Sequence, residues 1–129
     1  MIVLDASAVI ELLLRTPTGD DIARRIGGES LAVPHLVDVE VAQVMRRYER
    51  TGAVTPSRAR QALLDLCDLD AERYPHDVLV ARVWQLRANL TAYDAVYVVL
   101  AEALGATLLT CDGRLARAPG HRVRVERFA

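Results

Sequence analysis

The chain contains no lysine, so all 16 of its basic residues are arginines. Without a side-chain amine it cannot form a Schiff base, and it lacks the lysine of a P-loop nucleotide site. Cysteine is scarce as well, since Cys67 and Cys111 are the two present and they do not form a C-x-x-C pair. Their spacing favours two reduced thiols over a disulfide or a zinc site.

The sequence also lacks a long apolar run. A membrane-spanning helix needs about 18 consecutive apolar residues, and no segment reaches that length. The apolar N-terminal stretch is interrupted by Asp5 and Glu11 and is not preceded by basic residues, which argues against a signal peptide. We therefore expect a cytoplasmic protein that does not associate with a membrane.

The composition is that of a folded protein. Of the 129 residues, 52% are apolar and 26% are charged, which is sufficient for one domain over residues 1–129. The formal net charge of −1 does not by itself predict affinity for nucleic acid. If several of the 17 acids gather in one site, however, the remaining surface is mildly basic. That distribution is compatible with a polyanionic substrate bound through a metal ion.

Residues 90–114 are the most informative segment. Thr91 can cap a helix, and Asp94 lies in its first turn. The helix body is almost wholly apolar, which indicates burial on nearly every side. Gly105 is suited to end this helix, and residues 106–110 then predict a short buried strand. This strand brings Asp112 to its carboxyl end, the side of an open α/β sheet where ligands bind.

Short apolar runs alternate with helical patterns along the whole chain. This alternation predicts an α/β fold with a parallel sheet covered by helices on both faces. Strands are predicted at residues 2–5, 31–33, 71–74, 106–110 and 122–128, the last of these at an edge of the sheet. Helices are predicted at residues 8–14, 18–26, 36–50, 56–70, 77–90 and 92–104, with a helical turn near 115–120.

Helix starts and buried faces can also be predicted. Ser7 and Thr18 are the expected N-caps of the first two helices. Cys67 is expected on the inner face of the helix that follows Pro56. The apolar stripe of the next helix is expected to include Val80, Val83, Trp84 and Leu86.

Four acids occupy positions that suggest chemistry. Asp5 ends the first strand, Asp112 follows the strand at 106–110, Asp94 begins the most apolar helix, and Glu40 borders a buried helical stripe. Strand ends and helix starts on one side of a parallel sheet converge, so four carboxylates would repel one another there unless they took up protons or bound a cation. Carboxylate oxygens suit Mg²⁺ or Mn²⁺ better than zinc. Such a site favours phosphodiester hydrolysis.

Each acid also has a purely structural interpretation. Asp94 can serve its helix N-terminus, Asp112 can be a turn residue, and Glu40 can reach solvent from the edge of its helix. Asp5 is harder to explain in this way, because the first strand of a covered sheet has little use for a terminal charge.

The other polar residues are assigned simpler roles. Arg114 is a candidate for phosphate contact, although an exposed loop arginine is the commoner case. Ser7 is expected to cap a helix, with ligand or water binding as the alternative. Tyr93 and Tyr97 are expected to pack and not to stack on bases. Surface, capping or loop positions without a catalytic role are assigned to Asp20, Asp21, Asp38, His35, His76 and His121.

Three segments resemble the PIN-domain ribonucleases, specifically the VapC toxins of toxin–antitoxin pairs. They are VLDASAV near the start, PHLVDVEVAQVMRR in the middle, and LTAYDAVYVVLAEALGATLLTCDGRLA. The resemblance implies a three-layer α/β/α fold whose five-stranded parallel sheet has the order 3-2-1-4-5, flanked by about seven helices. It also implies a divalent-metal-dependent endonuclease acting on RNA, with a cognate VapB-like antitoxin and a homodimeric assembly.

The resemblance further assigns roles to individual residues. Asp5 and Asp94 would be the principal ligands of Mg²⁺ or Mn²⁺. Glu40 and Asp112 would complete or orient the acidic quartet. Ser7 falls where the family often has a small hydroxyl residue that assists the site.

Two other classes remain as alternatives. A phosphatase of the haloacid-dehalogenase type needs Asp-x-Asp after its first strand and a later lysine, whereas here Asp5 is followed by Ala6 and Ser7. A response-regulator receiver is disfavoured for the same reason, because it also needs a lysine and the chain has none. The other alternative is a PIN-like module that only binds RNA or protein, and a cleavage assay with Mg²⁺, Mn²⁺ and EDTA distinguishes it from an enzyme.

Overall fold

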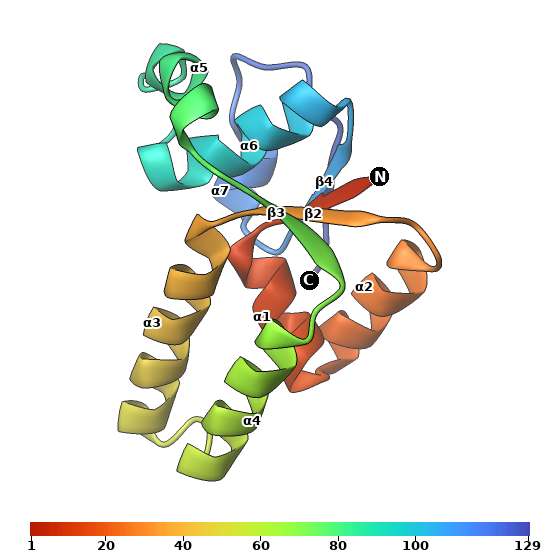
Figure 1. Ribbon diagram of the computed structural model, residues 1–129, viewed down its shortest axis with the longest axis vertical. Coiled ribbons are helices and arrows are strands. Elements are labelled where there is room, and N and C mark those ends of the chain that lie inside the picture. The colour runs from red at the N-terminus through yellow and green to blue at the C-terminus, as the bar shows by residue number, and fades with distance from the viewer.

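A five-stranded sheet lies between two layers of helices in the computed structural model, which describes residues 1–129 (Figure 1). Every pair of neighbouring strands is parallel, and the strand order is β3-β2-β1-β4-β5. The predicted fold class and strand order are therefore confirmed. The strands are β1 (Ile2–Leu4), β2 (Leu31–Pro34), β3 (Ala71–Tyr74), β4 (Thr107–Thr110) and β5 (Val125–Arg127).

Helices α1 to α4 lie on one side of the sheet, and α5 and α6 lie on the other (Figure 1). This arrangement gives the three layers expected from the alternating pattern. The helices are α1 (Ala6–Leu14), α2 (Pro17–Ile26), α3 (Leu36–Thr51), α4 (Pro56–Cys67), α5 (Val80–Gln85), α6 (Ala92–Leu104) and α7 (Gly113–Arg117), and a 3-10 turn, η1 (Asp77–Leu79), precedes α5. None of them is long and apolar enough to cross a lipid bilayer.

The core is built around β1 and α6. All three residues of β1 are fully buried, because β1 is the central strand and is covered on both faces. Residues 95–101 of α6 are likewise all buried, as predicted for a helix that is apolar on nearly every side. The carboxyl end of β1 and the start of α6 thereby adjoin the buried core of the molecule.

The predicted caps of the first two helices are wrong. Asp5, not Ser7, is the N-cap of α1, and its carboxylate accepts a hydrogen bond from the Ala8 amide at 2.9 Å. The chain enters α1 directly from β1, which leaves no room for a longer turn. Thr16, not Thr18, caps α2, because Pro17 is suited to the first helical position and the cap must precede it.

Three predicted core positions are also wrong. Val80 is 57% exposed and Trp84 is 65% exposed, because η1 and the six-residue α5 replace the single long helix that was expected. The apolar spacing of that helix therefore holds only in part. Leu86 is buried as predicted, and Leu79 is buried in place of Val80 and Trp84. Cys67 is exposed at the last residue of α4.

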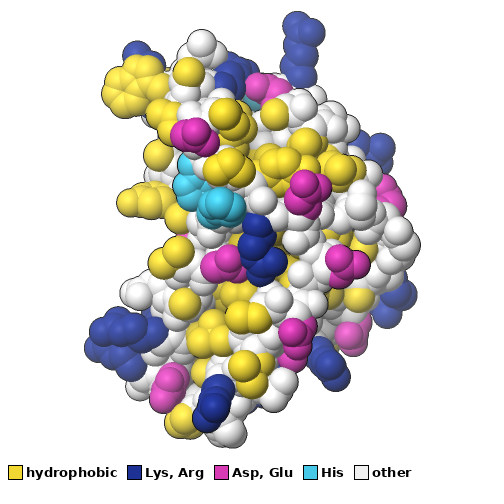
Figure 2. All heavy atoms as spheres, viewed as in Figure 1, with side chains coloured by type: hydrophobic (Ala, Val, Ile, Leu, Met, Phe, Trp, Pro, Cys, Tyr) yellow, Lys and Arg dark blue, Asp and Glu magenta, His cyan; other side chains and the backbone are white.

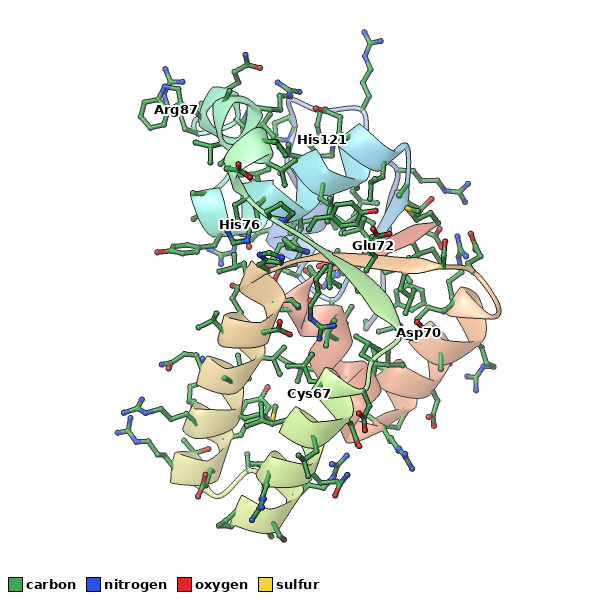
Figure 3. All side chains as sticks on the ribbon, viewed as in Figure 1. Cys67, Asp70, Glu72, His76, Arg87 and His121 are labelled. Atoms are coloured by element: carbon green, nitrogen blue, oxygen red, sulfur yellow. The ribbon has the colours of Figure 1, made fainter.

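The outer side of Trp84 is partly covered by a basic side chain. The guanidinium of Arg87 lies 4.5 Å from the centroid of the Trp84 ring, in a cation–π contact. Figure 3 shows Arg87 at the outer end of the molecule, beyond α5.

Helix α3, which carries Glu40, is attached to β3 and to the segment that follows it. The Leu36 amide at the start of α3 donates to Nε2 of His76 at 2.9 Å, and Figure 3 shows His76 beside this helix end. Arg73 of β3 donates to both carboxylate oxygens of Asp38, with Nε at 2.9 Å from Oδ2. Asp38 is therefore an ion-pair partner and not the free surface or capping acid that was predicted.

Candidate active site

Asp5 is the most deeply buried acid of the site, with 4% of its surface exposed. Its carboxylate accepts three hydrogen bonds, from the Ser7 hydroxyl at 2.7 Å, the Ala8 amide at 2.9 Å and the Thr110 hydroxyl at 2.5 Å. Burial raises the pKa of Asp5 above its ordinary value, and the three hydrogen bonds oppose this rise. The carboxylate is thus held in one orientation at the end of the central strand.

Two hydroxyl groups connect the ends of β1 and β4. Ser7 donates to Asp5 and accepts a hydrogen bond from the Cys111 amide at 2.9 Å. Thr110 donates to Asp5 and accepts from the Asp112 amide at 2.9 Å. Both hydroxyls therefore contact Asp5, and the assisting role that the resemblance implies for Ser7 stays a prediction, whereas Thr110 was not predicted. The sequence feature that could have identified Thr110 is a hydroxyl residue at the end of a buried strand, two residues before Asp112.

Asp94 and Asp112 each have a structural role as well as a place in the site. The Asp94 amide donates to the Thr91 hydroxyl at 3.2 Å, so Thr91 caps α6 as predicted. Asp112 is the N-cap of α7 and accepts from the Arg114 amide at 2.8 Å. Burial raises the pKa of Asp94, and the negative charge of Asp112 raises it further, while the positive charge of Arg114 lowers it.

Glu40 reaches the site from α3. Burial raises the pKa of Glu40, and the charges of Asp94 and Asp5 add to the rise. The Tyr97 hydroxyl donates to its Oε1 at 2.5 Å. Tyr97 packs in the core as predicted, with 1% of its surface exposed, but this hydrogen bond was not foreseen. The signal was a tyrosine three residues after Asp94, on the same face of an otherwise aliphatic helix.

The four predicted acids are therefore brought close enough for their charges to interact. The negative charge of Asp112 raises the pKa values of Asp5 and Asp94. The charges of Asp94 and Asp5 likewise raise the pKa of Glu40. Clustered pKa shifts of this kind are typical of functional sites.

The acids do not form a closed metal cage. No group of three or more His, Cys, Asp or Glu side chains is arranged to hold a metal ion. Mg²⁺ commonly binds proteins through one or two carboxylates and keeps several of its waters. A donor set of carboxylates, open to solvent on one side, fits that mode of binding and does not fit a structural zinc site.

A groove of about 670 Å³ runs from the acidic site between α1 and α3. Ser7, Glu40 and Arg47 are among the residues that line it. Tyr93 lines it with 63% of its surface exposed, so the prediction that Tyr93 packs is wrong. The reason is its place in the first turn of α6, before the helix passes over the sheet. Figure 2 shows basic side chains along the outer part of α3.

The sequence matches a known domain family and several named proteins. The PIN domain family matches residues 2–121. Ribonuclease VapC12 of Mycobacterium tuberculosis is 41% identical over 129 residues, which cover all of both chains. Ribonuclease VapC9 of the same species is 47% identical over 117 residues, covering 90% of this chain and 89% of the relative.

Solved structures have the same fold. PAE2754 from Pyrobaculum aerophilum superposes with a TM-score of 0.68 at 26% identity, over 89% of this chain and 83% of that one. VapBC2 from Rickettsia felis, bound to a DNA fragment from its promoter, superposes with a TM-score of 0.72 at 16% identity over the whole of both chains. Together with the matched domain and the sequence relatives, these results show that the chain belongs to the PIN-domain family and, within it, to the VapC ribonucleases.

Proposed function

We propose that this protein hydrolyses phosphodiester bonds in RNA with a divalent metal ion, and that it is the toxin of a toxin–antitoxin pair. The observation that carries the proposal is the group of Asp5, Glu40, Asp94 and Asp112, whose charges destabilise one another in the absence of a cation. Two relatives at 41% and 47% identity are named ribonucleases.

Asp5 and Asp94 are the proposed principal ligands of Mg²⁺ or Mn²⁺, and Glu40 and Asp112 complete the site. The bound ion supplies charge neutralisation at the phosphate and lowers the pKa of a water molecule. The side chains of the protein itself orient the metal-binding carboxylates. Ser7 and Thr110 orient Asp5 through hydrogen bonds of 2.7 and 2.5 Å.

Arg114 is the proposed phosphate contact. It is exposed at the start of α7, and its charge already acts on Asp94. A guanidinium in this position can pair with the phosphate next to the scissile bond.

The experiment that tests the proposal compares wild type with Asp94→Asn. The wild type is expected to cut RNA with Mg²⁺ or Mn²⁺ and not with EDTA, and mapping of RNA 5′ ends after brief expression is expected to show defined cut sites. Asp94→Asn is expected to lose cleavage while it remains folded. Asp20→Asn is the matched control, because Asp20 is an exposed acid in the first turn of α2.

Two results would contradict the proposal. Cleavage by purified Asp94→Asn at the wild-type rate would remove Asp94 from the site. Binding of RNA by the wild type without metal-dependent cleavage would favour the non-catalytic PIN-like module instead.

The proposed partner is a small VapB-like antitoxin. Structural neighbours include a VapBC complex from Rickettsia felis and one from Salmonella typhimurium. The largely apolar groove beside the acids, in which Val39 is 67% exposed, suits an amphipathic helix followed by an arginine-bearing tail. Co-expression with the small protein encoded next to this gene is expected to give a co-purifying complex without nuclease activity.

The proposed active form is a homodimer of a single-domain chain that works in the cytoplasm. Support for self-association comes from Val78, Val80 and Trp84, which expose 79%, 57% and 65% of their surfaces near α5. Figure 2 shows apolar side chains over this end of the molecule. An apolar patch that stays uncovered is unfavourable in water, so a second copy of the chain is the proposed occupant.

A further inference from the structure

Tyr97 is a polar side chain in the least polar helix of the protein. It lies on α6 among Ala95, Val96, Val98 and Val99, all of them buried. Its own surface is 1% exposed. A phenol in such surroundings must have a hydrogen-bond partner, because an unpartnered buried hydroxyl is costly. Its partner comes from a different helix and belongs to the acidic site.

That partner is Glu40, whose Oε1 accepts from the Tyr97 hydroxyl at 2.5 Å. The phenol is the one protein group that hydrogen-bonds to the Glu40 carboxylate. One oxygen is therefore fixed, and Oε2 is left without a protein partner. Asp5, by comparison, is oriented by three donors.

Glu40 needs such a restraint more than the other acids do. Its side chain has one more rotatable bond than an aspartate, and it lines a groove that opens to solvent. Without the phenol the carboxylate could rotate away from Asp5 and Asp94 and into that groove.

We propose that Tyr97 is a positioning residue of the reaction, which acts through Glu40 by holding its carboxylate toward the metal ion bound by the acidic quartet. The inference rests on the proposed function. A hydrogen-bond partner that orients a metal-binding carboxylate commonly changes metal affinity or activity by about 10–100-fold when it is removed.

The test uses Tyr97→Phe in the full chain, since this change removes the hydroxyl and retains the ring. Mn²⁺ binding is measured by calorimetry without RNA, and RNA cleavage is measured as separate kcat and KM values. We expect Mn²⁺ affinity and kcat to fall about 10–100-fold, with KM for RNA unchanged. Thermal melting and circular dichroism check that the variant is folded.

Tyr74→Phe is the matched control. Glu72 raises the pKa of Tyr74, so this phenol also interacts with a glutamate. It lies at the end of β3, outside the groove. We expect this variant to bind Mn²⁺ and to cleave RNA as the wild type does. In a Glu40→Gln background, Tyr97→Phe is expected to have no further effect on either measurement.

Each outcome supports or overturns the inference. Wild-type Mn²⁺ affinity in Tyr97→Phe overturns it, as does a lower melting temperature with no change in affinity, because the phenol would then serve packing alone. If the wild type binds Mn²⁺ and cuts no RNA, the proposed function fails, while the affinity difference still decides the role of Tyr97. A wild type that binds no Mn²⁺ overturns both.

Discussion

At the scale of single residues, two hydroxyl groups determine how the acidic site is held together. Ser7 and Thr110 bind the Asp5 carboxylate from two different elements and also accept backbone amides at the end of β4. A buried carboxylate with fixed donors costs little reorganisation when its ligand arrives. The two hydroxyls therefore link the geometry of β1 to that of β4.

We expect Thr110→Val to lower RNA cleavage about 10–100-fold, because Asp5 loses a donor that orients it. Val and Thr have similar volumes, and the loss of buried hydrogen bonds should lower the free energy of unfolding by about 1–3 kcal/mol. Thr107→Val is the control, since Thr107 lies at the opposite end of the same strand. Cleavage rates and urea melts would measure both effects. An unchanged rate in a folded Thr110→Val variant would show that Asp5 does not depend on this donor.

The repulsion among the acids predicts how stability depends on pH. Burial raises the pKa values of Asp5, Glu40 and Asp94 in the folded protein. The folded state therefore holds protons that the unfolded state has already released, and stability falls as pH rises. In EDTA, these groups should therefore stabilise the protein more near pH 4.5, close to their ordinary pKa values, than at pH 7. Melting temperatures at the two pH values measure this difference.

Asp94→Asn isolates this effect, because it removes one of the repelling charges. We expect the variant to melt above the wild type at pH 7 without metal, and the difference to shrink toward pH 4.5. Asp20→Asn, at the exposed surface, should show no such pH-dependent difference. A difference of the same size at both pH values would mean that the charge of Asp94 does not destabilise the metal-free protein.

The positions of the acids could be predicted from the sequence, but their partners from distant parts of the chain could not. Asp5, Asp94 and Asp112 lie at strand ends or helix starts. The local pattern therefore predicts that they lie at the carboxyl edge of the sheet. The hydrogen bond from Thr110 to Asp5 spans 105 residues, and that from Tyr97 to Glu40 spans 57. No local pattern in the sequence encodes such a pair, because the two side chains meet only through the packing of the whole sheet.

At the scale of elements, α2 packs directly against the backbone of α1. Gly19 in the first turn of α2 is buried against the backbone of α1, and a Cβ at this position would lie 2.0 Å from the carbonyl oxygen of Glu11. Thr16, which precedes α2, donates to the same carbonyl. Position 19 of α2 can therefore accommodate only glycine, because any side chain there would overlap the backbone of α1.

We expect Gly19→Ala to destabilise the protein by about 2–3 kcal/mol, because the methyl group overlaps backbone that cannot move freely. Gly28→Ala is the matched control. A Cβ there would meet nothing within 4 Å, so its effect should be close to neutral. Urea unfolding of both variants provides the measurement. Equal stability of Gly19→Ala and the wild type would mean that α2 can shift away from α1.

Elements were predictable where one pattern ran without interruption. Helix α6 and strand β4 follow the sequence pattern from Thr91 through Thr110, since cap, apolar body, glycine and strand all agree. The segment after His76 was mispredicted as one helix, because its apolar residues fit a helical period over 77–90. The change from a 3-10 turn to a short α-helix depends on packing against α6, which the sequence does not display.

At the scale of the whole molecule, the exposed apolar side chains near α5 predict self-association. Light scattering is expected to give twice the mass of the chain at micromolar concentration. Val78→Asp should shift the protein to the monomer, because it places a charge in the proposed contact. Leu64→Asp is the control, since Leu64 is 50% exposed on α4, away from this patch. A monomer at every concentration of the wild type would contradict the proposed homodimer.

The strand order has a consequence for synthesis. The central strand β1 is made first, yet one of its neighbours is β4, and the acids of the site extend from Asp5 to Asp112. A growing polypeptide that has left the ribosome only as far as residue 90 can pair three of the strands, but it has neither Asp94 nor Asp112. The proposed catalytic site can therefore be complete only after Asp112 has been added, and an antitoxin made at the same time has an interval in which to meet the partly made chain.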